Sequence, residues 1–521
     1  MDADVAVVGY GPVGMATAAL LGRAGHRVVV LERYAGLYNL PRAAIFDDET
    51  MRTFARLGIA EELLPKVHAQ RSYEWRNGAG ELLIEVDYAE RGRSGWAEWY
   101  MMYQPDLEDA MDRVCREMSV VDIRLGHTVT ALEDSGDGVE LTVEGPQGTH
   151  LVTARYVIGC DGGNSFVRQT LGVGQFDYGF SEPWLVCDFR FRKPVFVPPA
   201  RQVGDPRQPV SIISLGPDHH RFSFMLDSAE SFDTERQPER VWARVRDYLQ
   251  PEDAELIRAA TYTFRSLVAH RWRIGRTLLA GDAAHQMPPF LGQGMCSGVR
   301  DAQNIAFKLD LILRGQDGAE LLDTYQSERE PHVRAVIEKG IELGRLQTLR
   351  DPAAAAERDR RLLAQRAANQ APEKIRFPGL GPGFLAGRSG PGRGELSVHG
   401  VVGDGTREGR FDELVDGGFC LIATATAGQA LETDGTAAEL RGAGVQVAVL
   451  GEQPATGRLK DIDGTYHKWF AELGCAAAVI RPDFYVFGTA PDHAAAGALV
   501  RELLDALGSP RPVSSTTPER S

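Results

Sequence analysis

A carboxylate stands at the end of a short apolar run in the stretch from residue 277 to residue 309. The run Thr277–Ala280 predicts a buried strand that stops at Gly281 and Asp282. A carboxylate at a strand end can accept hydrogen bonds from the hydroxyl groups of a ligand. Alone, the segment is more typical of an ordinary strand, loop and helix than of a cofactor site.

The same stretch continues into a turn and a helix. Pro288 and Pro289 require a bend, because neither fits inside a helix or a central strand. Gly292 and Gly294 then precede a helix expected from Met295 to Leu309. Free amide groups at a helix start, helped by the helix dipole, favour partial negative charge. A flavin needs such an arrangement, because its ribityl hydroxyls must be held and its ring edge becomes anionic on reduction.

The amino terminus carries a second pattern. A strand-like run, Val5–Val8, is followed by a glycine turn and an apolar helix that continues to about Ala24, and a second strand ends in an acid about 20 residues on. This context predicts a dinucleotide-binding unit, in which glycines let the backbone approach a pyrophosphate and the acid takes ribose hydroxyls. The residues concerned are Gly9, Gly11, Pro12, Gly14 and Glu32.

A third strand and turn lies at residues 157–168, with Asp161 at the turn. By itself it could be any Asp-Gly turn.

Together the three segments resemble the class A flavoprotein monooxygenases, the single-component aromatic hydroxylases. GDAAHQMPPF (281–290) and CDGGNSFVR (160–168) are similar to that family's FAD motifs, and YQSEREPHVR (325–334) is most similar to its 3-(3-hydroxyphenyl)propionate hydroxylase group. Polyketide and rifampicin hydroxylases share the architecture. The resemblance implies that NADH or NADPH reduces FAD, which forms a C4a-hydroperoxide with O₂ that hydroxylates a phenolic ring. It also implies FAD contacts for Arg33, Arg42 and Gln104, beside Asp161, Gly281, Asp282, Pro289, Gly292, Gly294 and Met295.

The resemblance and the strand pattern predict an α/β and α+β chain: a Rossmann-type FAD-binding domain with an inserted antiparallel-sheet substrate domain, plus a thioredoxin-like C-terminal domain. The expected boundaries are 1–71, 97–180 and 269–349 for the FAD-binding domain, 72–96 and 181–268 for the substrate domain, 350–394 for a helix and linker, 395–508 for the C-terminal domain and 509–521 for a disordered tail.

Residues for catalysis and substrate binding are harder to place. Candidates for the catalytic groups are His285, Pro288, Asp48 and Tyr100, although His285 also suits a structural role in the loop. A carboxylate tail on the substrate would need an arginine, and Arg190, Arg192, Arg221 and Arg265 all lie in expected strands. We expect Arg221, Phe222 and Phe224 to contact the substrate, while a larger polyketide or an amino-phenol stays open.

Composition narrows the function classes. The net charge of −15 disfavours a nucleic-acid surface, and the six cysteines contain no Cys-x-x-Cys pair, so neither a metal site nor a redox dithiol is indicated. No apolar run of membrane-spanning length occurs and the start is acidic, so we expect a cytoplasmic protein without a membrane partner. The expected partners are a small aromatic substrate and O₂, with a homodimer also open. The rival functions are a non-hydroxylating flavin oxidoreductase, a halogenase and a non-catalytic FAD-binding protein.

Overall fold

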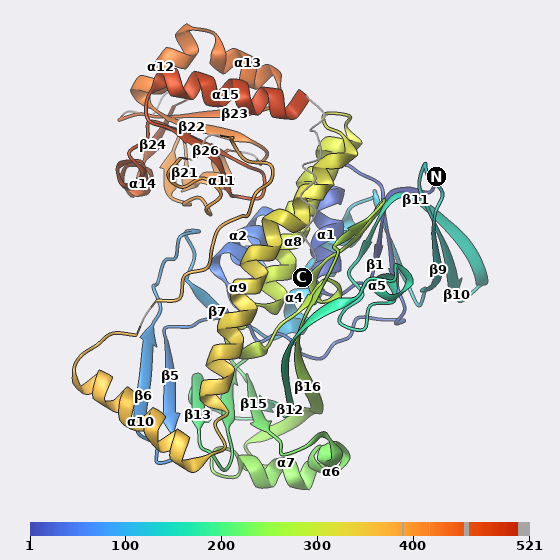
Figure 1. The fold of residues 1–521 in the computed structure, drawn as a ribbon, viewed down its shortest axis with the longest axis vertical. Helices are drawn as coiled ribbons and strands as arrows, with labels where there is room; N and C mark the ends of the chain where they lie inside the picture. The colour runs from blue at the N-terminus through green and yellow to red at the C-terminus, as the bar shows by residue number, and fades with distance from the viewer. Residues whose placement is uncertain (373, 388–389, 416, 453–457, 509–521) are drawn as a thin grey trace, which may run out of the picture.

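The computed structural model describes residues 1–372, 374–387, 390–415, 417–452 and 458–508. The tail expected at 509–521 lies outside the described residues. The described residues form three main parts: a Rossmann-type domain, a large antiparallel sheet beside it and a C-terminal module (Figure 1).

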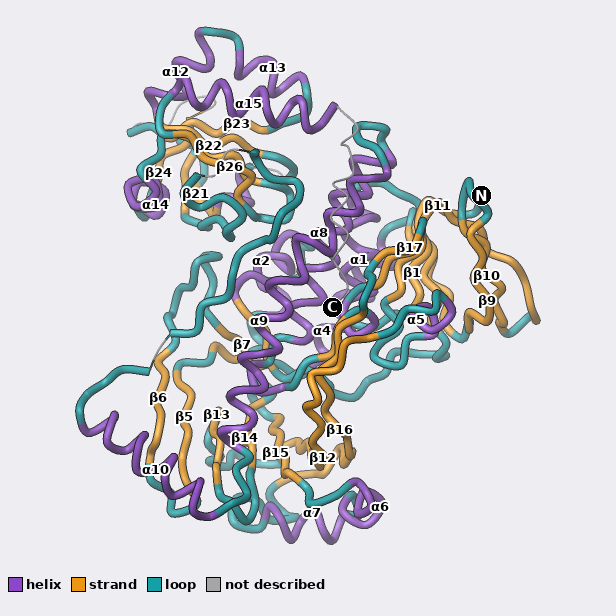
Figure 2. Tube along the Cα trace, in the orientation of Figure 1, coloured by secondary structure: helices purple, strands orange, loops and turns teal. Residues whose placement is uncertain are grey.

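The Rossmann-type domain is built on a sheet whose main strand order is β17-β18-β11-β1-β2-β8. Neighbours from β18 to β8 run parallel, and β9, β10 and β11 form an antiparallel meander. The helices α1, α4 and α8 pack together beside this sheet (Figure 2). The elements are β1 (Ala3–Val8), β2 (Val28–Glu32), β8 (Val121–Leu125), β9 (Thr128–Asp134), β10 (Val139–Gly145), β11 (Gly148–Gly159), β17 (Arg273–Ile274), β18 (Thr277–Leu279), α1 (Pro12–Arg23), α4 (Gln104–Glu117), α5 (Phe166–Thr170) and α8 (Gly294–Leu313).

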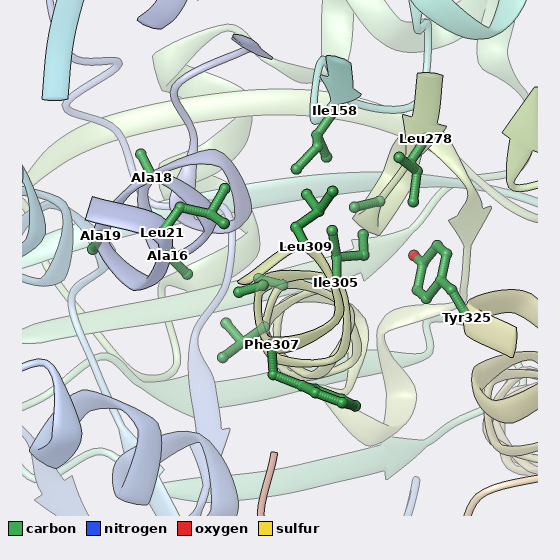
Figure 3. Close-up of a cluster of buried hydrophobic side chains, with 14 of the residues drawn as sticks. Ala16, Ala18, Ala19, Leu21, Ile158, Leu278, Ile305, Phe307, Leu309 and Tyr325 are labelled. Atoms are coloured by element: carbon green, nitrogen blue, oxygen red, sulfur yellow. The ribbon is translucent and has the colours of Figure 1, made fainter. Parts of the chain in front are cut away.

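The core of this domain lies between the sheet and two helices. Small alanines of α1 allow α8 to approach closely, and Ile305 and Leu309 of α8 point toward Ile158 of β11 (Figure 3). These side chains are fully buried. Tight packing of this kind fixes α8, and therefore its amino-terminal end, relative to the glycine turn before α1.

The second sheet has the order β19-β16-β12-β15-β14-β13-β5-β6. Its two long strands, β12 and β16, pair over most of their length and connect the Rossmann-type domain to the rest of the sheet. The elements are β5 (Ser72–Asn77), β6 (Leu82–Asp87), β12 (Gln175–Phe191), β13 (Ala200–Gly204), β14 (Val210–Ser214), β15 (His219–Met225), β16 (Ala254–Ala269), β19 (His285–Gln286), α6 (Phe232–Glu235) and α7 (Pro238–Val245).

One expected helix in this region is too long. The sequence suggests helix from Gln237 to Leu256, but α7 ends at Val245 and β16 begins at Ala254. Leu249 extends the apolar pattern because it is buried in the same core beyond the helix end, so periodicity alone overstates the helix.

A small sheet and short helices join the two large parts. They are β3 (Ile45–Asp47), β4 (His68–Ala69), β7 (Trp99–Met101), α2 (Asp48–Arg56) and α3 (Ala60–Leu63). The long helix α9 (Thr324–Gln347) runs from the side of the C-terminal module to the second sheet, and α10 (Pro352–Ala367) packs on β6 (Figure 1).

The C-terminal module has a sheet of order β21-β20-β24-β23-β22-β25-β26. The parallel pair β22–β23, continued by the antiparallel pair β25–β26, is the arrangement expected of a thioredoxin-like module, and the mixed α/β fold class is confirmed. The elements are β20 (Val401–Gly403), β21 (Glu408–Arg410), β22 (Cys420–Thr424), β23 (Gln446–Leu450), β24 (Arg458–Asp461), β25 (Ala477–Ile480), β26 (Val486–Ala490), α11 (Phe411–Leu414), α12 (Ala425–Thr433), α13 (Thr436–Gly442), α14 (Thr465–Leu473) and α15 (His493–Gly508).

Buried charges hold the C-terminal module to the Rossmann-type domain. The Oε2 atom of Glu328 accepts hydrogen bonds from Lys308 (2.9 Å), Asn304 (2.7 Å) and Arg481 (2.7 Å), and Arg481 also donates to Asp483. The charged members are fully or almost fully buried. Because Arg481 and Asp483 belong to the C-terminal module, that module completes the core of its neighbour. No helix among the described residues is long and apolar enough to cross a membrane.

Candidate functional site

In chain order, residues 5–32 form the first of the three motifs, residues 157–168 the second and residues 277–309 the third. They meet through their glycines. A Cβ atom at Gly9 would lie 2.5 Å from the carbonyl oxygen of Cys160, and one at Gly14 would lie 2.1 Å from the carbonyl oxygen of Gly9. A Cβ atom at Gly298 of α8 would lie 2.4 Å from the side chain of Val13. Glycine is therefore required at these positions by close packing between the motifs.

Gly11 differs from the other glycines of the first motif, because a Cβ atom there would meet nothing within 4 Å. The start of α1 thus offers open backbone with no side-chain cap. The Glu32 carboxylate lies beside it and accepts hydrogen bonds from the backbone N–H groups of Tyr10 (2.7 Å) and Tyr34 (2.9 Å). A carboxylate has about four acceptor positions, so Glu32 retains capacity for ribose hydroxyls. Open amides next to an acid fit a pyrophosphate and a ribose.

Asp161 lies in the second motif, at the turn between β11 and α5. Its Oδ2 atom accepts from the Val167 N–H (3.0 Å), while its buried Oδ1 atom makes no hydrogen bond in the described part of the chain. A buried unpaired carboxylate oxygen calls for a donor from outside the protein. Arg168 joins this motif to the third one, because it donates to the carbonyl groups of Gly163 (2.9 Å) and Ala283 (3.0 Å).

Asp282 lies in a short turn, Gly281–Ala283, that follows β18. Its side chain is exposed at the surface of the turn, and the crowded surroundings desolvate the carboxyl and raise its pKa. Gly281 starts the turn with φ +59°, a left-handed conformation that favours glycine. Arg168 links this turn, at Ala283, to the loop that carries Asp161, at Gly163. An exposed carboxylate on such a fixed turn suits the hydroxyls of a ribityl chain.

The turn is held by Asp301 of α8. One carboxylate oxygen of Asp301 accepts hydrogen bonds from the Gly281 N–H (3.1 Å) and from His285 Nε2 (2.6 Å), and the other accepts from Arg329 Nε (3.0 Å). All three side chains are buried. Burial acts to raise the pKa of Asp301, but the charges and hydrogen bonds of its partners outweigh it and lower the pKa. Asp301 is thus an ionised clamp for the turn that carries Asp282.

The amino-terminal end of α8 is held by a second charge network. Gln293, which precedes the helix, donates to Asp47 (3.0 Å) and accepts from Arg300 (2.9 Å), and Arg300 also binds Asp47 and Glu49. A Cβ atom at Gly292 would lie 2.2 Å from Ile45, so the loop packs tightly on β3. The first amides of α8 have no side-chain cap, which leaves the helix end free for a ligand.

Two of the predicted FAD residues, Arg42 and Gln104, contact each other. The Gln104 side-chain oxygen accepts from the N–H groups of Arg42 (2.9 Å) and Ala43 (2.6 Å), and so fixes this loop. The exposed Arg42 guanidinium lies 4.1 Å from the centre of the Tyr38 ring. Arg33 is exposed over Tyr34, and direct contacts of these residues with FAD remain predictions.

The predicted catalytic residues do not form one cluster. His285 is fully buried against Asp301, so the structure gives it a role in positioning the turn in place of the catalytic role expected from the sequence. Pro288 is buried against Gly340 of α9, whereas Pro289 is exposed. The structure therefore gives Pro288 a packing role, and Pro289 is the proline of this loop that a ligand can reach.

Asp48 and Tyr100 lie on the side that faces the C-terminal module. Burial raises the pKa of Asp48 to about 7, helped by the charge of Asp47, and Asp48 accepts from the Ser94 N–H (2.7 Å). The Ser94 carbonyl in turn contacts His399 of the C-terminal module (2.9 Å). Tyr100 is buried, and its hydroxyl accepts from the Ala97 N–H. This location, away from the second sheet, favours structural roles for both.

The second sheet turns one face to the Rossmann-type domain. Arg221 lies on this inner face, where it binds Asp188 (2.6 Å) and donates to the carbonyl groups of Pro41 (2.8 Å) and Arg42 (2.6 Å). Phe222 and Phe224 point to the opposite face and pack in the core beneath α7. Their expected contact with substrate is therefore corrected: alternation separates the two faces of a strand but does not tell which one faces the flavin.

Sequence reasoning gave no role to the residues that connect the motifs. Asp301, Arg300 and Arg329 lie in helices, and their charged partners His285, Asp47 and Asp301 are 16, 253 and 28 positions away in sequence. The sequence does contain one signal that could have found them. Arg300 and Asp301 are charged residues inside an otherwise apolar helix pattern, and charges that are buried require partners.

Comparisons with known proteins agree with this geometry. Residues 2–340 match the family described as FAD binding domain, and residues 394–506 match the HcaD C-terminal domain. A probable NADH-specific resorcinol 4-hydroxylase of Rhodococcus jostii is 50% identical over 99% of this chain and 96% of its own length. A 3-(3-hydroxy-phenyl)propionate/3-hydroxycinnamic acid hydroxylase of Mycolicibacterium smegmatis is 36% identical over 68% of this chain and 63% of its own length.

A solved structure is similar over nearly the whole molecule. Aklavinone-11 hydroxylase, in a ternary complex with FAD and aklavinone, superposes with a TM-score of 0.77 at 27% identity, covering 97% of this chain and 99% of that protein. The matched family spans more than half of the chain and includes all three motifs. This chain therefore belongs to the FAD-binding-domain family of FAD-dependent aromatic hydroxylases.

Proposed function

We propose that this protein is an NADH-dependent FAD monooxygenase that hydroxylates a small phenol without a carboxylate group, such as resorcinol. The choice of NADH and of a resorcinol-like ring is supported by the relative named as a probable NADH-specific resorcinol 4-hydroxylase, which is similar over almost its entire length.

Bound FAD would supply the redox chemistry, taking a hydride from NADH and delivering one oxygen atom of O₂ to the ring. The chain would hold the cofactor through the open amides near Gly11, through Glu32 and through Asp282. The free amino-terminal end of α8 would accept negative charge on the ring edge. The inner face of the second sheet would orient the phenol and exclude water.

The arginines of the second sheet carry the proposal of a neutral substrate. Each of the three guanidinium nitrogen atoms of Arg221 donates to Asp188 or to a backbone carbonyl group. Arg190 is exposed and paired with Glu255, and Arg192 and Arg265 are exposed. A carboxylate is best bound by a guanidinium with two free parallel donors, which none of these four arginines provides on the inner face. Arg258 does not provide it either, because its Nη1 atom is already directed at Pro41 and Asp188. The smaller, uncharged phenol is therefore favoured over a hydroxyphenylpropionate.

A substrate panel tests this proposal. The FAD-loaded enzyme is supplied with NADH, O₂ and resorcinol, phenol, 3-(3-hydroxyphenyl)propionate or a polycyclic phenol, and oxygenated product and NADH loss are both measured. We expect resorcinol to give product with the highest kcat/KM. Product from the carboxylated or polycyclic phenols alone would overturn the substrate class, and NADH oxidation without product from any phenol would indicate a non-hydroxylating flavin oxidoreductase. A homodimer and a cytoplasmic location remain predictions from the sequence.

A further inference from the structure

A strip of small side chains crosses the inner face of the second sheet. Ser211 of β14 lies opposite Ser223 of β15, which lies opposite Val186 of β12, which lies opposite Ala260 of β16. Directly opposed residues on antiparallel strands point to the same face. The strip shares its face with Arg221, because residues two apart on a strand point the same way.

Larger residues border the strip on both sides. On one side the row Asp188, Arg221 and Arg258 contacts the carbonyl groups of the loop at Pro41. On the other side Trp184 packs against Phe290 of the third motif, with ring centres 5.9 Å apart. Both borders thus reach the Rossmann-type domain, whereas the side chains of the strip between them are shorter.

An unpaired donor stands at the edge of the strip. Arg258 is 7% exposed, and its Nη1 atom is directed at the Pro41 carbonyl and at Asp188 (3.5 Å). Its buried Nη2 atom has no partner of good hydrogen-bond geometry in the described part of the chain, and the hydroxyl of Tyr38, on the facing loop, also interacts with this guanidinium. A buried guanidinium N–H without a well-aligned acceptor is costly, so an oxygen ligand at this position is favourable. Arg258 lies two positions before Ala260 on β16 and hence on the same face.

The donor is close to the expected position of the flavin ring. The segment that Arg258 contacts at Pro41 continues to Ile45, which packs on Gly292 in the loop before α8. Four residue steps span at most about 14 Å, so Arg258 and the flavin loop lie within one small region.

We propose that Arg258 Nη2 binds the phenolic oxygen of the substrate, with the strip from Ser211 to Ala260 as the floor under its ring. This inference rests on the proposed function and deepens it. The guanidinium stabilises the oxygen as it acquires negative charge, and the phenolic proton passes to water. The ring becomes more electron-rich, which is what an electrophilic oxygen donor requires, and no side-chain base has to be in contact with the phenol.

The charges around this position agree with the assignment. Asp188 is shared by two cations, Arg221 and Arg258, so the group carries excess positive charge. Tyr38, from the facing loop, shows how a phenol responds at this position: burial acts to raise its pKa, but the charges of Arg258 and Arg42, together with hydrogen bonds from both, outweigh burial and lower it. A substrate phenol beside Arg258 would experience the same attraction in a more enclosed setting.

The test uses 4-nitrophenol, whose ionised form has its own absorbance, bound to the oxidised FAD enzyme without NADH. We expect the pKa of the bound probe to lie about one to three pH units below its value in solution. The substitution Arg258→Met should abolish at least half of that difference and raise KM for resorcinol about tenfold or more. The matched control Arg190→Gln removes an exposed arginine from the same sheet and should leave both quantities unchanged.

A second variant covers the case in which Arg258→Met does not fold. Arg258→Lys retains the positive charge next to Asp188, but its ammonium would pair there and leave no donor at the Nη2 position, so the probe should again lose at least half of its pKa difference. An unshifted probe in the wild-type enzyme, or a full shift retained in the folded variants, would overturn the inference. Either result together with normal resorcinol hydroxylation leaves the proposed function intact, whereas no product from any phenol in the wild-type enzyme rejects that function.

Discussion

The clamp at Asp301 gives the sharpest prediction about how the cofactor site is built. In Asp301→Asn the side chain keeps its size but loses its charge. Its single amide oxygen can serve Arg329 or the Gly281 turn, but not both, whereas the native carboxylate serves both. The variant therefore leaves a buried guanidinium without its carboxylate, or releases the turn that carries Asp282.

Two magnitudes follow from this change. Removing one partner of a buried ion pair lowers the free energy of unfolding by about 3–5 kcal/mol. Misplacing Asp282 removes hydrogen bonds from a charged group to the cofactor, about 1.5–3 kcal/mol, which corresponds to roughly 10- to 150-fold weaker FAD binding. Because the pKa of Asp301 is lowered in the fold, its stabilisation is present above the unfolded pKa of about 3.9 and is lost as pH falls through the lower folded pKa. The stability difference between wild type and variant should thus be constant near neutral pH and shrink only in acid.

The assay combines urea unfolding at several pH values with FAD titration of the apoprotein, followed by flavin fluorescence. Asp310→Asn is the matched control, because Asp310 lies on the same helix and pairs with His26 and Arg314 in a partly exposed position. We expect the control to bind FAD like the wild type. Wild-type FAD affinity together with unchanged unfolding in Asp301→Asn would refute the clamp.

Three other changes test separate parts of the molecule. Asp282→Ala should weaken FAD binding about tenfold or more while the apoprotein unfolds normally, because the side chain is exposed and only the cofactor loses a partner; equilibrium dialysis of FAD measures this, and unchanged retention would contradict it. Glu328→Gln should lower the free energy of unfolding by about 3–5 kcal/mol and expose the C-terminal module to limited proteolysis, since Lys308 and Arg481 lose a shared buried carboxylate; an unchanged cleavage pattern would contradict this. Cys420→Ser and Cys475→Ser should retain hydroxylation, because burial raises the pKa of both thiols; loss of turnover with FAD still bound would reveal a redox role.

The parts of the site that were predictable from sequence depend on local backbone requirements. Gly9 and Gly14 must be glycine because their neighbours leave no room for a Cβ atom, and such positions recur at fixed spacing after a strand. Asp282 was predictable for the same reason, since it directly follows a short buried strand. Fold class follows from these motifs together with strand alternation.

The parts that were not predictable depend on contacts between distant segments. The roles of Asp301 and Arg300 come from partners on other elements, and periodicity only shows that they lie in an apolar helix. Phe222 was assigned to the substrate because its strand alternates, but the choice of face is made by α7, which covers the phenylalanine side. The sequence motif made His285 a candidate catalytic residue, but its burial against Asp301 indicates that it positions the turn.

The central claim is that this chain places one oxygen atom from O₂ on a small neutral phenol at the expense of NADH. The most direct measurement is a reaction with resorcinol under ¹⁸O₂, with NADH consumption, hydrogen peroxide and labelled product all quantified. We expect one labelled oxygen in the product for each NADH consumed, with little peroxide. Complete conversion of the NADH electrons to peroxide, with no labelled product from resorcinol or any other phenol, would contradict it.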